Sequence, residues 1–218
     1  MPAPWNRSVT GGLAALLALW IGAVLLLDRS GVLATAAPQA FRPVLLTVIV
    51  PIALFLAAYA ASPSLRRLVL AQDLTALTML QHWRVLGFAF LMLYAHDVLP
   101  ALFAWPAGFG DIAIGFATPL VVRALLRRPD FATSRRFLAF NLLGLLDFVV
   151  AAATASLASG AFPALLSGPL TSAPMETWPL LLFPAFFVPA FTILHLSVLF
   201  QVAAQRRAAR LPRELVHA

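Results

Sequence analysis

Six long apolar runs limit what this chain can fold into more than any other feature of the sequence. A helix needs roughly 20 mostly apolar residues to cross about 30 Å of hydrocarbon, and each run meets this length within a few residues. The runs are about 9–27, 43–61, 73–99, 109–126, 137–157 and 179–203. Because every backbone group inside a bilayer must find its partner within the protein, runs of this length favour helices. The sequence therefore predicts an all-α, polytopic membrane helix bundle with six transmembrane helices, forming a single integral membrane domain over residues 1–218.

The composition also indicates a membrane protein. Hydrophobic residues make up 62% of the chain and charged residues 11%, whereas soluble domains usually carry about 25% charged residues. The net charge of +7 comes from arginine alone, since the sequence has no lysine. These arginines flank apolar runs, which is typical of topology signals and does not indicate nucleic acid binding. The absence of cysteine excludes a disulfide framework, a thiolate metal site and a cysteine nucleophile.

The positions of the arginines predict the orientation of the bundle. The connections between runs three and four and between runs five and six contain no arginine, and the connection between runs one and two has two, Arg29 and Arg42, partly offset by Asp28. Arginines instead follow the second, fourth and sixth runs, at Arg66, Arg67, Arg127, Arg128, Arg135, Arg136, Arg206, Arg207, Arg210 and Arg213. Cytoplasmic loops carry an excess of Lys and Arg, so we expect both termini, including a tail over 204–218, to be cytoplasmic in a bacterial inner membrane.

The first apolar run raises the question of a signal peptide. The small residues "ATA" at 34–36 loosely resemble a cleavage site. However, the apolar run is long for a signal peptide, and Asp28 and Arg29 separate it from these small residues. We therefore expect a first helix that is not cleaved.

Four ionisable residues are predicted to share one layer near the middle of the bilayer. At about 1.5 Å per helical residue, His82 and Arg84 lie roughly 14–17 Å from the cytoplasmic face. On the same scale, Asp147 lies at about 15 Å and His195 at about 12 Å. An unpaired Arg or Asp at this depth costs about 2.5–3.5 kcal/mol on the insertion scale. We therefore expect Arg84 to pair with Asp147 across the third and fifth helices.

This polar layer has a structural and a functional interpretation. In the structural one, the residues only bond the helices to one another. In the functional one, they line a cavity, where Arg84 holds an anion or neutralises Asp147, Asp147 carries a proton and His195 relays it. Thr192, one turn before His195, is expected to orient its ring. The residues assigned to binding or proton relay are Arg84, Asp147, His195, His82, Gln81 and Asn141.

A second polar group is predicted near the outer face. His96 and Asp97 end the third run, and Asp111 follows "PAGFG" at the start of the fourth. An acidic residue in a first helical turn is favoured by the free amides and the helix dipole. Asp111 is therefore either a helix cap or part of an outer polar vestibule together with His96 and Asp97.

Four prolines lie inside the predicted helices, at Pro51, Pro119, Pro184 and Pro189. Each removes an amide donor and frees the carbonyl four residues earlier, which tends to kink the helix. Such kinks would permit gating in a carrier.

No familiar catalytic motif supports an enzyme, since HExxH, GxSxG, GxxxxGK[ST] and GxGxxG are all absent. His195 with Asp147 would make an acid–base pair but lacks a nucleophile, and no metal site is predicted. His82 and His96 lie fourteen residues apart and point within about 40° of each other, a spacing similar to that in di-haem cytochrome b helices. The resemblance is limited to this spacing. It leaves one haem b between His82 and His195 as an alternative.

These features favour a small transporter-like protein with a buried Arg/Asp/His cluster. Six helices are few for a self-contained carrier, so we expect a homodimer. One alternative is a non-catalytic membrane subunit that assembles with partner subunits, and another is a b-type haem protein or other redox membrane protein. The expected partners are the lipid bilayer and a small anion or proton, and no nucleic acid.

Overall fold

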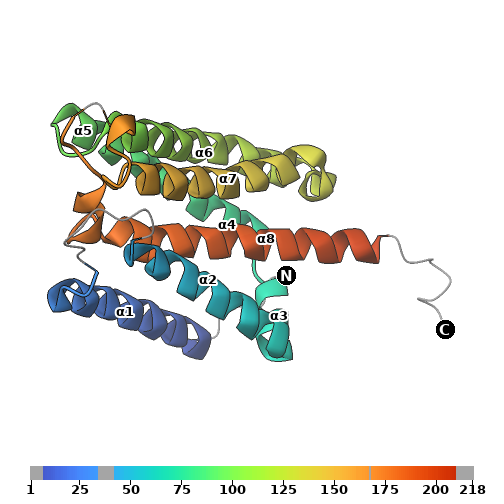
Figure 1. Ribbon diagram of the computed structural model, residues 1–218. Helices are drawn as coiled ribbons and strands as arrows, with labels where there is room; N and C mark the ends of the chain where they lie inside the picture. Colours follow the sequence, from blue (N-terminus) through green and yellow to red (C-terminus); the bar gives the residue numbers. More distant parts are fainter. Residues whose placement is uncertain (1–6, 34–41, 167, 210–218) are drawn as a thin grey trace, which may run out of the picture.

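The computed structural model describes residues 7–33, 42–166 and 168–209 (Figure 1). Every regular element in these residues is helical, and six helices are long and apolar enough to cross a membrane. The predicted all-α fold with six spans is therefore confirmed, while the orientation of the termini stays a prediction. Four spans are single helices: α1 Arg7–Ser30, α2 Val44–Ala61, α6 Ala101–Arg127 and α7 Arg135–Leu157. The "ATA" at 34–36 and residues 210–218 of the predicted tail lie outside the described residues.

The third and sixth spans change helix type along their length. The third runs from α4 (Leu74–Met79) through the 3₁₀ helix η1 (Leu80–Gly87) into α5 (Phe88–Ala95). The sixth begins as the π-helix η5 (Phe183–Phe187) and continues as α8 (Val188–Ala208). The shorter elements are α3 Pro63–Leu70, η2 Pro129–Thr133, η3 Pro163–Leu165 and η4 Ala173–Glu176. Stretches of 3₁₀ or π geometry inside longer helices are frequent at functional sites.

The fourth span begins earlier than predicted, at Ala101 instead of residue 109. The segment "WPAGFG" has the composition of a turn, yet it is helical in the structure. Pro106 lies in the second turn of α6, so it releases only the carbonyl of Leu102 in the first turn, and membrane helices tolerate this. As a result, Asp111 lies inside the helix, about 15 Å from its start, and not in the first turn.

The helices are arranged in layers around α8. In Figure 1, α6 and α7 lie side by side, and α8 runs between them and the pair formed by α2 and α1. The third span packs against α6 along its length, and α1 contacts mainly η5 at the periphery. The interior of the bundle is therefore enclosed by the third span, α6, α7 and α8.

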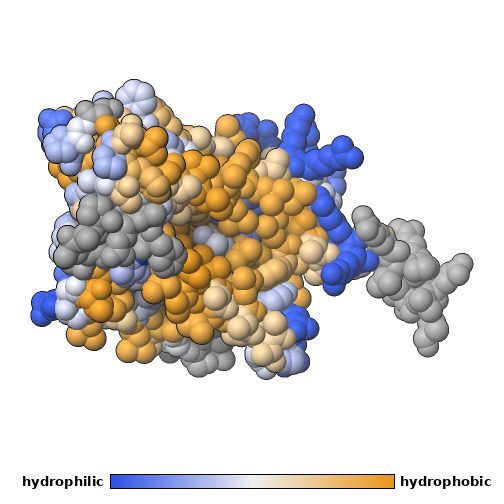
Figure 2. Space-filling model, viewed as in Figure 1, coloured by the Kyte–Doolittle hydropathy of each residue, from blue (hydrophilic) through white to orange (hydrophobic). Residues whose placement is uncertain are grey.

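The outer surface of the bundle is apolar, as expected for contact with lipid. Figure 2 shows a broad hydrophobic band with hydrophilic residues toward its two ends. Large apolar side chains are exposed on the outside of the helices, such as Leu19 and Leu126, which are 73% and 71% exposed. The end with Arg66, Arg135 and Arg206 is called the basic end below. The opposite end, with the α5–α6 and α7–η5 connections, is called the loop end.

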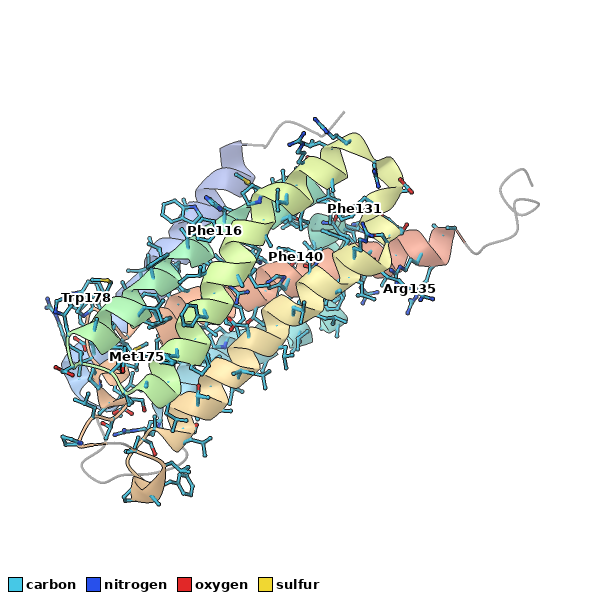
Figure 3. The ribbon with its side chains drawn as sticks, turned by 90° about the horizontal axis from the view of Figure 1, so that it is seen from above. Phe116, Phe131, Arg135, Phe140, Met175 and Trp178 are labelled. Carbon is cyan, nitrogen blue, oxygen red and sulfur yellow. The ribbon has the colours of Figure 1, made fainter. Side chains whose placement is uncertain are left out.

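Figure 3 shows the bundle at right angles to the first view, with Phe131 and Arg135 at the basic end, Met175 and Trp178 at the loop end, and Phe116 and Phe140 between them. At the basic end, Gln201 Nε2 donates to the carbonyls of Val69 (2.9 Å) and Gln72 (3.1 Å). These bonds attach the end of α3 to α8.

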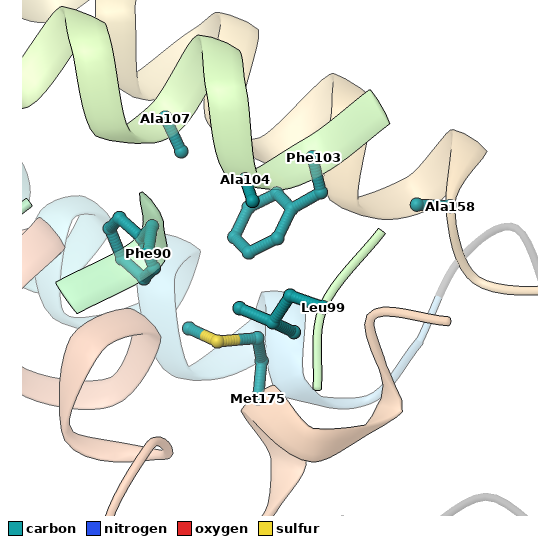
Figure 4. Close-up of a cluster of buried hydrophobic side chains, with 7 residues drawn as sticks. All are labelled: Phe90, Leu99, Phe103, Ala104, Ala107, Ala158 and Met175. Carbon is teal, nitrogen blue, oxygen red and sulfur yellow. The ribbon is translucent and has the colours of Figure 1, made fainter. Parts of the chain in front are cut away.

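The loop end has its own hydrophobic core (Figure 4), formed by Phe90, Leu99, Phe103, Ala104, Ala107, Ala158 and Met175. A buried ion pair lies in the same region, where Arg42 Nε is 2.5 Å from Glu176 Oε1. Arg42 Nη1 also donates to the carbonyl of Ser159 (3.2 Å). Together these contacts join the start of α2 to the α7–η5 connection.

Candidate functional site

Every third residue of the third span is buried from residue 78 to residue 90, at Thr78, Gln81, Arg84, Gly87 and Phe90. A 3₁₀ helix has three residues per turn, so residues at this spacing line up on one face. The 3₁₀ geometry of η1 thus aims Gln81 and Arg84 into the bundle, while Trp83 between them is 61% exposed toward lipid.

Arg84 lies between two carboxylates in the bundle interior. Its Nε donates to Asp111 Oδ1 (2.7 Å), and its Nη2 donates to Asp147 Oδ2. The Arg84 side chain has no exposed surface. The pair with Asp147 that the sequence predicts is present, and Asp111 joins it as a second carboxylate.

Asp111 is therefore not placed where the sequence suggested. Because α6 begins at Ala101, Asp111 is neither a cap in the first turn nor a neighbour of the residues that end α5. His96 and Asp97 are exposed at the loop end, and Asp97 adopts a positive φ of 56°. The structure does not bring these three residues together into one vestibule.

A directed chain of hydrogen bonds fixes His195 beside Arg84. Asn141 Nδ2 donates to the carbonyl of Phe137 (2.9 Å), which turns Asn141 Oδ1 toward the imidazole. Since this oxygen only accepts, His195 Nδ1 must carry a proton and donate to it (2.9 Å). His195 Nε2 is left to accept from Arg84 Nη1 (3.2 Å). In this arrangement His195 is a neutral acceptor that holds the guanidinium in place.

The remaining surroundings of Arg84 come from α7. The carbonyl of Gly144 accepts a second hydrogen bond from Nη1 (3.1 Å). The ring of Phe148 lies with its centroid 4.0 Å from Arg84 Cζ, and the ring of Phe140 contacts His195 edge-on. The guanidinium is thus held by acceptors in its plane and by an aromatic ring above it, which favours a cation.

Two glycines allow the helices to approach closely enough for this cluster. A β-carbon on Gly144 would overlap the His195 ring and lie 3.1 Å from Arg84 Nη1. A β-carbon on Gly110 would overlap the carboxylate of Asp147. Both positions therefore need a residue without a side chain.

His82 lies outside this cluster and has a different partner. Pro119 has no amide to donate to the carbonyl of Gly115, and His82 Nδ1 donates to that carbonyl instead (2.9 Å). In the same way, Trp20 Nε1 donates to the carbonyl of Ala185 (2.9 Å). Pro189, four residues later, has no amide to donate to this carbonyl. Two proline sites in the spans are thus completed by ring N–H groups from neighbouring helices.

The contact between His82 and Gly115 leads to a testable prediction. His82→Leu should destabilise the protein by about 1–3 kcal/mol, because it leaves a buried carbonyl without a donor. The unfolding free energy can be measured by SDS titration in mixed micelles. In a Pro119→Ala background the restored amide would donate to the Gly115 carbonyl. His82→Leu should then destabilise the protein much less. An equal cost in both backgrounds would contradict this role of His82.

Gln81 and Thr192 make no side-chain hydrogen bond to Arg84 or His195. Gln81 Nε2 donates to the carbonyl of Phe191 (3.2 Å), but its Oε1 has no hydrogen-bond partner among the described residues. The Thr192 hydroxyl is likewise without a partner in this part of the chain, so it does not orient His195 as expected.

The arrangement of the histidines does not fit a haem. Both ring nitrogens of His195 bond to protein side chains, and Gly144 lies against its ring. His82 Nδ1 bonds to the Gly115 carbonyl of α6. The neighbour of His195 Nε2 is Arg84, and not an open space shared with His82. His82 and His195 are therefore not placed to hold one haem b between them.

A cavity of about 80 Å³ extends from the loop end to this cluster. In this measure one water needs about 10–15 Å³, so the cavity has room for several waters or a small organic molecule. Arg42 and Glu176 line it at the loop end, and Asp111 lines it deep in the membrane. Figure 2 shows a hollow in the apolar face between α7 and α2, whose residues form opposite walls of the cavity.

Asp111 is the member of the cluster that this cavity reaches. Its side chain keeps 14% of its surface exposed, compared with 9% for Asp147 and 0% for Arg84. Its Oδ1 accepts from Arg84, and its Oδ2 accepts no hydrogen bond from the described residues. Asp111 is therefore the point where the buried cluster meets the cavity.

A protein-family model described as a domain of unknown function (DUF8737) matches residues 40–203, well over half of the chain. The matched range contains the whole cluster and leaves α1 outside it. No curated protein and no solved structure matches the chain.

Proposed function

Because the chain belongs to this family, whose description states no activity, we propose from the site itself that the protein is a small proton-linked carrier. In this proposal Asp111 and Asp147, bridged by Arg84, form the proton-binding centre. The proposal also includes the topology expected from the arginines, with the basic end and both termini on the cytoplasmic side of a bacterial inner membrane. Assembly as a homodimer, or with a partner subunit, stays a prediction.

The observation that supports this proposal is the charge of the buried cluster. One guanidinium contacts two carboxylates, and the adjacent His195 is a neutral acceptor. With both carboxylates ionised, the cluster would have one uncompensated negative charge, which is costly inside a membrane. One bound proton, shared by Asp111 and Asp147, balances the charge. The cavity at Asp111 gives this proton a route to the exterior.

The geometry favours a proton over an anion at this centre. Nε, Nη1 and Nη2 of Arg84 all donate to protein acceptors, so the guanidinium has little capacity left for a bound anion. Arg84 therefore serves to hold the two carboxylates together. His195 and Asn141 are positioning residues, because they orient Arg84 and lie on the side of it away from Asp111.

Infrared spectroscopy tests the bound proton directly. Wild-type protein at neutral pH should show the C=O band of a protonated carboxylic acid. The band should be lost in Asp111→Asn and also in Asp147→Asn, since either variant leaves one carboxylate to balance Arg84. Asp73→Asn is the matched control, because Asp73 is an exposed cap of α4. No band in the wild type, or a band that persists in both cluster variants, would contradict the proposal.

Transport is tested in proteoliposomes that contain a pH-sensitive dye. The low-molecular-mass fraction of a cell extract, added outside, should cause proton movement with wild-type protein and none with Asp111→Asn. Equal proton movement with both proteins would show that the cluster has no part in transport.

A further inference from the structure

The cavity at Asp111 has the features of a binding site for one class of ligand. Its walls are apolar along most of their length, and they include Val48, Phe103, Ala107, Phe148, Ala152 and Val188. Small-molecule sites are typically concave and mostly apolar, with a few polar groups that fix orientation. Here those polar groups lie at the two ends, and the charge at each end identifies the ligand.

The loop end of the cavity is electrically balanced, whereas the inner end is not. At the loop end Arg42 is paired with Glu176. At the inner end Asp111 lines the cavity, its Oδ2 accepts no hydrogen bond from the described residues, and the cluster behind it holds two carboxylates against one guanidinium. An anion in the cavity would meet this excess negative charge, while a cation would compensate it.

We propose that this cavity binds one small hydrophobic cation, with its charged group at Asp111 and its apolar body between α2, α6 and α7. This inference rests on the proposed function and names its substrate class. The cation and the proton would neutralise the same excess charge, so they compete for the same place. When the cation binds, the proton leaves the carboxyl group for water. One monovalent cation is therefore exchanged for one proton, and the charge of the cluster with its ligand stays constant.

The size of the cavity depends on small residues of α6 and α7. Ala107 and Ala152 line it from these two helices. Position 152 lies five residues beyond Asp147 on α7, about 7.5 Å along the helix, so a larger side chain there would fill the cavity and leave Arg84 and Asp147 themselves unchanged. Ala153, the next residue of α7, is exposed on the outer surface and gives a matched control. This pair of positions separates the cavity from the proton-binding centre.

The probe for this proposal is benzyltrimethylammonium, with neopentylbenzene as a neutral ligand of the same shape. Binding is measured by calorimetry on the detergent-solubilised full chain in two buffers of different ionisation enthalpy, which counts the protons released. We expect the cation to bind at least about tenfold more tightly than the neutral ligand, because it pairs with a buried charge. We also expect about one proton released per cation bound.

Variants complete the test. Asp111→Asn should weaken binding of the cation at least about tenfold and abolish proton release. Ala152→Leu should abolish binding but keep the infrared carboxylic acid band, and Ala153→Leu should behave as the wild type. Equal affinity for both ligands would overturn the inference, since it would make the cavity a site for neutral apolar molecules. So would unchanged cation binding in Ala152→Leu.

The infrared band distinguishes the two proposals. If the band is present and the cation does not bind selectively, this inference is wrong and the proton-binding centre stands. If the band is absent from the wild-type protein, the proposed function is wrong.

Discussion

Replacing Arg84 with methionine should destabilise the protein more than any other single substitution in the polar cluster. Methionine keeps an unbranched apolar stem but removes the guanidinium and with it the donors to Asp111, Asp147 and His195. Two buried carboxylates would then face each other without a counter-charge. Removing one partner of a buried ion pair typically costs about 3–5 kcal/mol. We expect a lower unfolding free energy in SDS titration and little monodisperse protein in mild detergent.

Two further variants separate the charge of Arg84 from its packing. Arg84→Met combined with Asp111→Asn and Asp147→Asn should recover part of the lost stability, because no buried charge is then left unpaired. Trp83→Leu is the matched control on the same helix, since Trp83 is exposed to lipid and should change little. A single Arg84→Met variant as stable as the wild type would show that the cluster contributes no net stability.

The fold follows from the sequence because its strongest signal is simple. Runs of about 20 apolar residues leave the backbone few alternatives to a membrane helix. The same depth arithmetic placed Arg84 and Asp147 at one level, and the cost of burying either alone required a partner. Both conclusions depend on helix rise and on desolvation, which are nearly independent of how the helices pack.

Which residues form the site was harder to predict from the sequence. The depth of a residue in the membrane does not tell toward which neighbouring helix its side chain points. His82 and Arg84 lie at nearly the same level, yet His82 bonds only to the Gly115 carbonyl of α6, whereas Arg84 bonds to α7 and α8 as well as to α6. Assigning these directions needs the local helix type. The polar and small residues Thr78, Gln81, Arg84 and Gly87 recur at every third position, which is the period of a 3₁₀ helix and was the available signal.

Asp111 was misplaced for a different reason. Pro106 and the glycines near it have the composition of a turn, and in water this interpretation would be favoured. Inside a membrane, the cost of leaving backbone groups unpaired keeps such a segment helical. The cavity could not be predicted, since it arises where alanines of α6 and α7 face the side chains of α2 across a gap. The sequence shows the alanines but not the gap.

Because α7 and α8 approach closely at Gly144, we expect replacement of glycine by alanine to lower the unfolding free energy at this position and to raise it at Gly22. Gly144→Ala would place a methyl group against the His195 ring and Arg84 Nη1. The ring cannot move away freely, because Asn141 holds its Nδ1. Overpacking costs about 1–3 kcal/mol, and a lost hydrogen bond to a charged group costs about 1.5–3 kcal/mol. We expect a net loss of about 2–4 kcal/mol in SDS titration.

Gly22→Ala in α1 is the matched control. No atom lies within 4 Å of a β-carbon built on Gly22, so only the helix propensity changes, and it favours alanine by about 0.8–1 kcal/mol. Gly144→Ala gains the same propensity and should nevertheless lose stability. If both variants are stabilised equally, α7 and α8 are not in contact through His195. If Gly144→Ala is destabilised but keeps the infrared carboxylic acid band, His195 positions Arg84 without being needed for the bound proton.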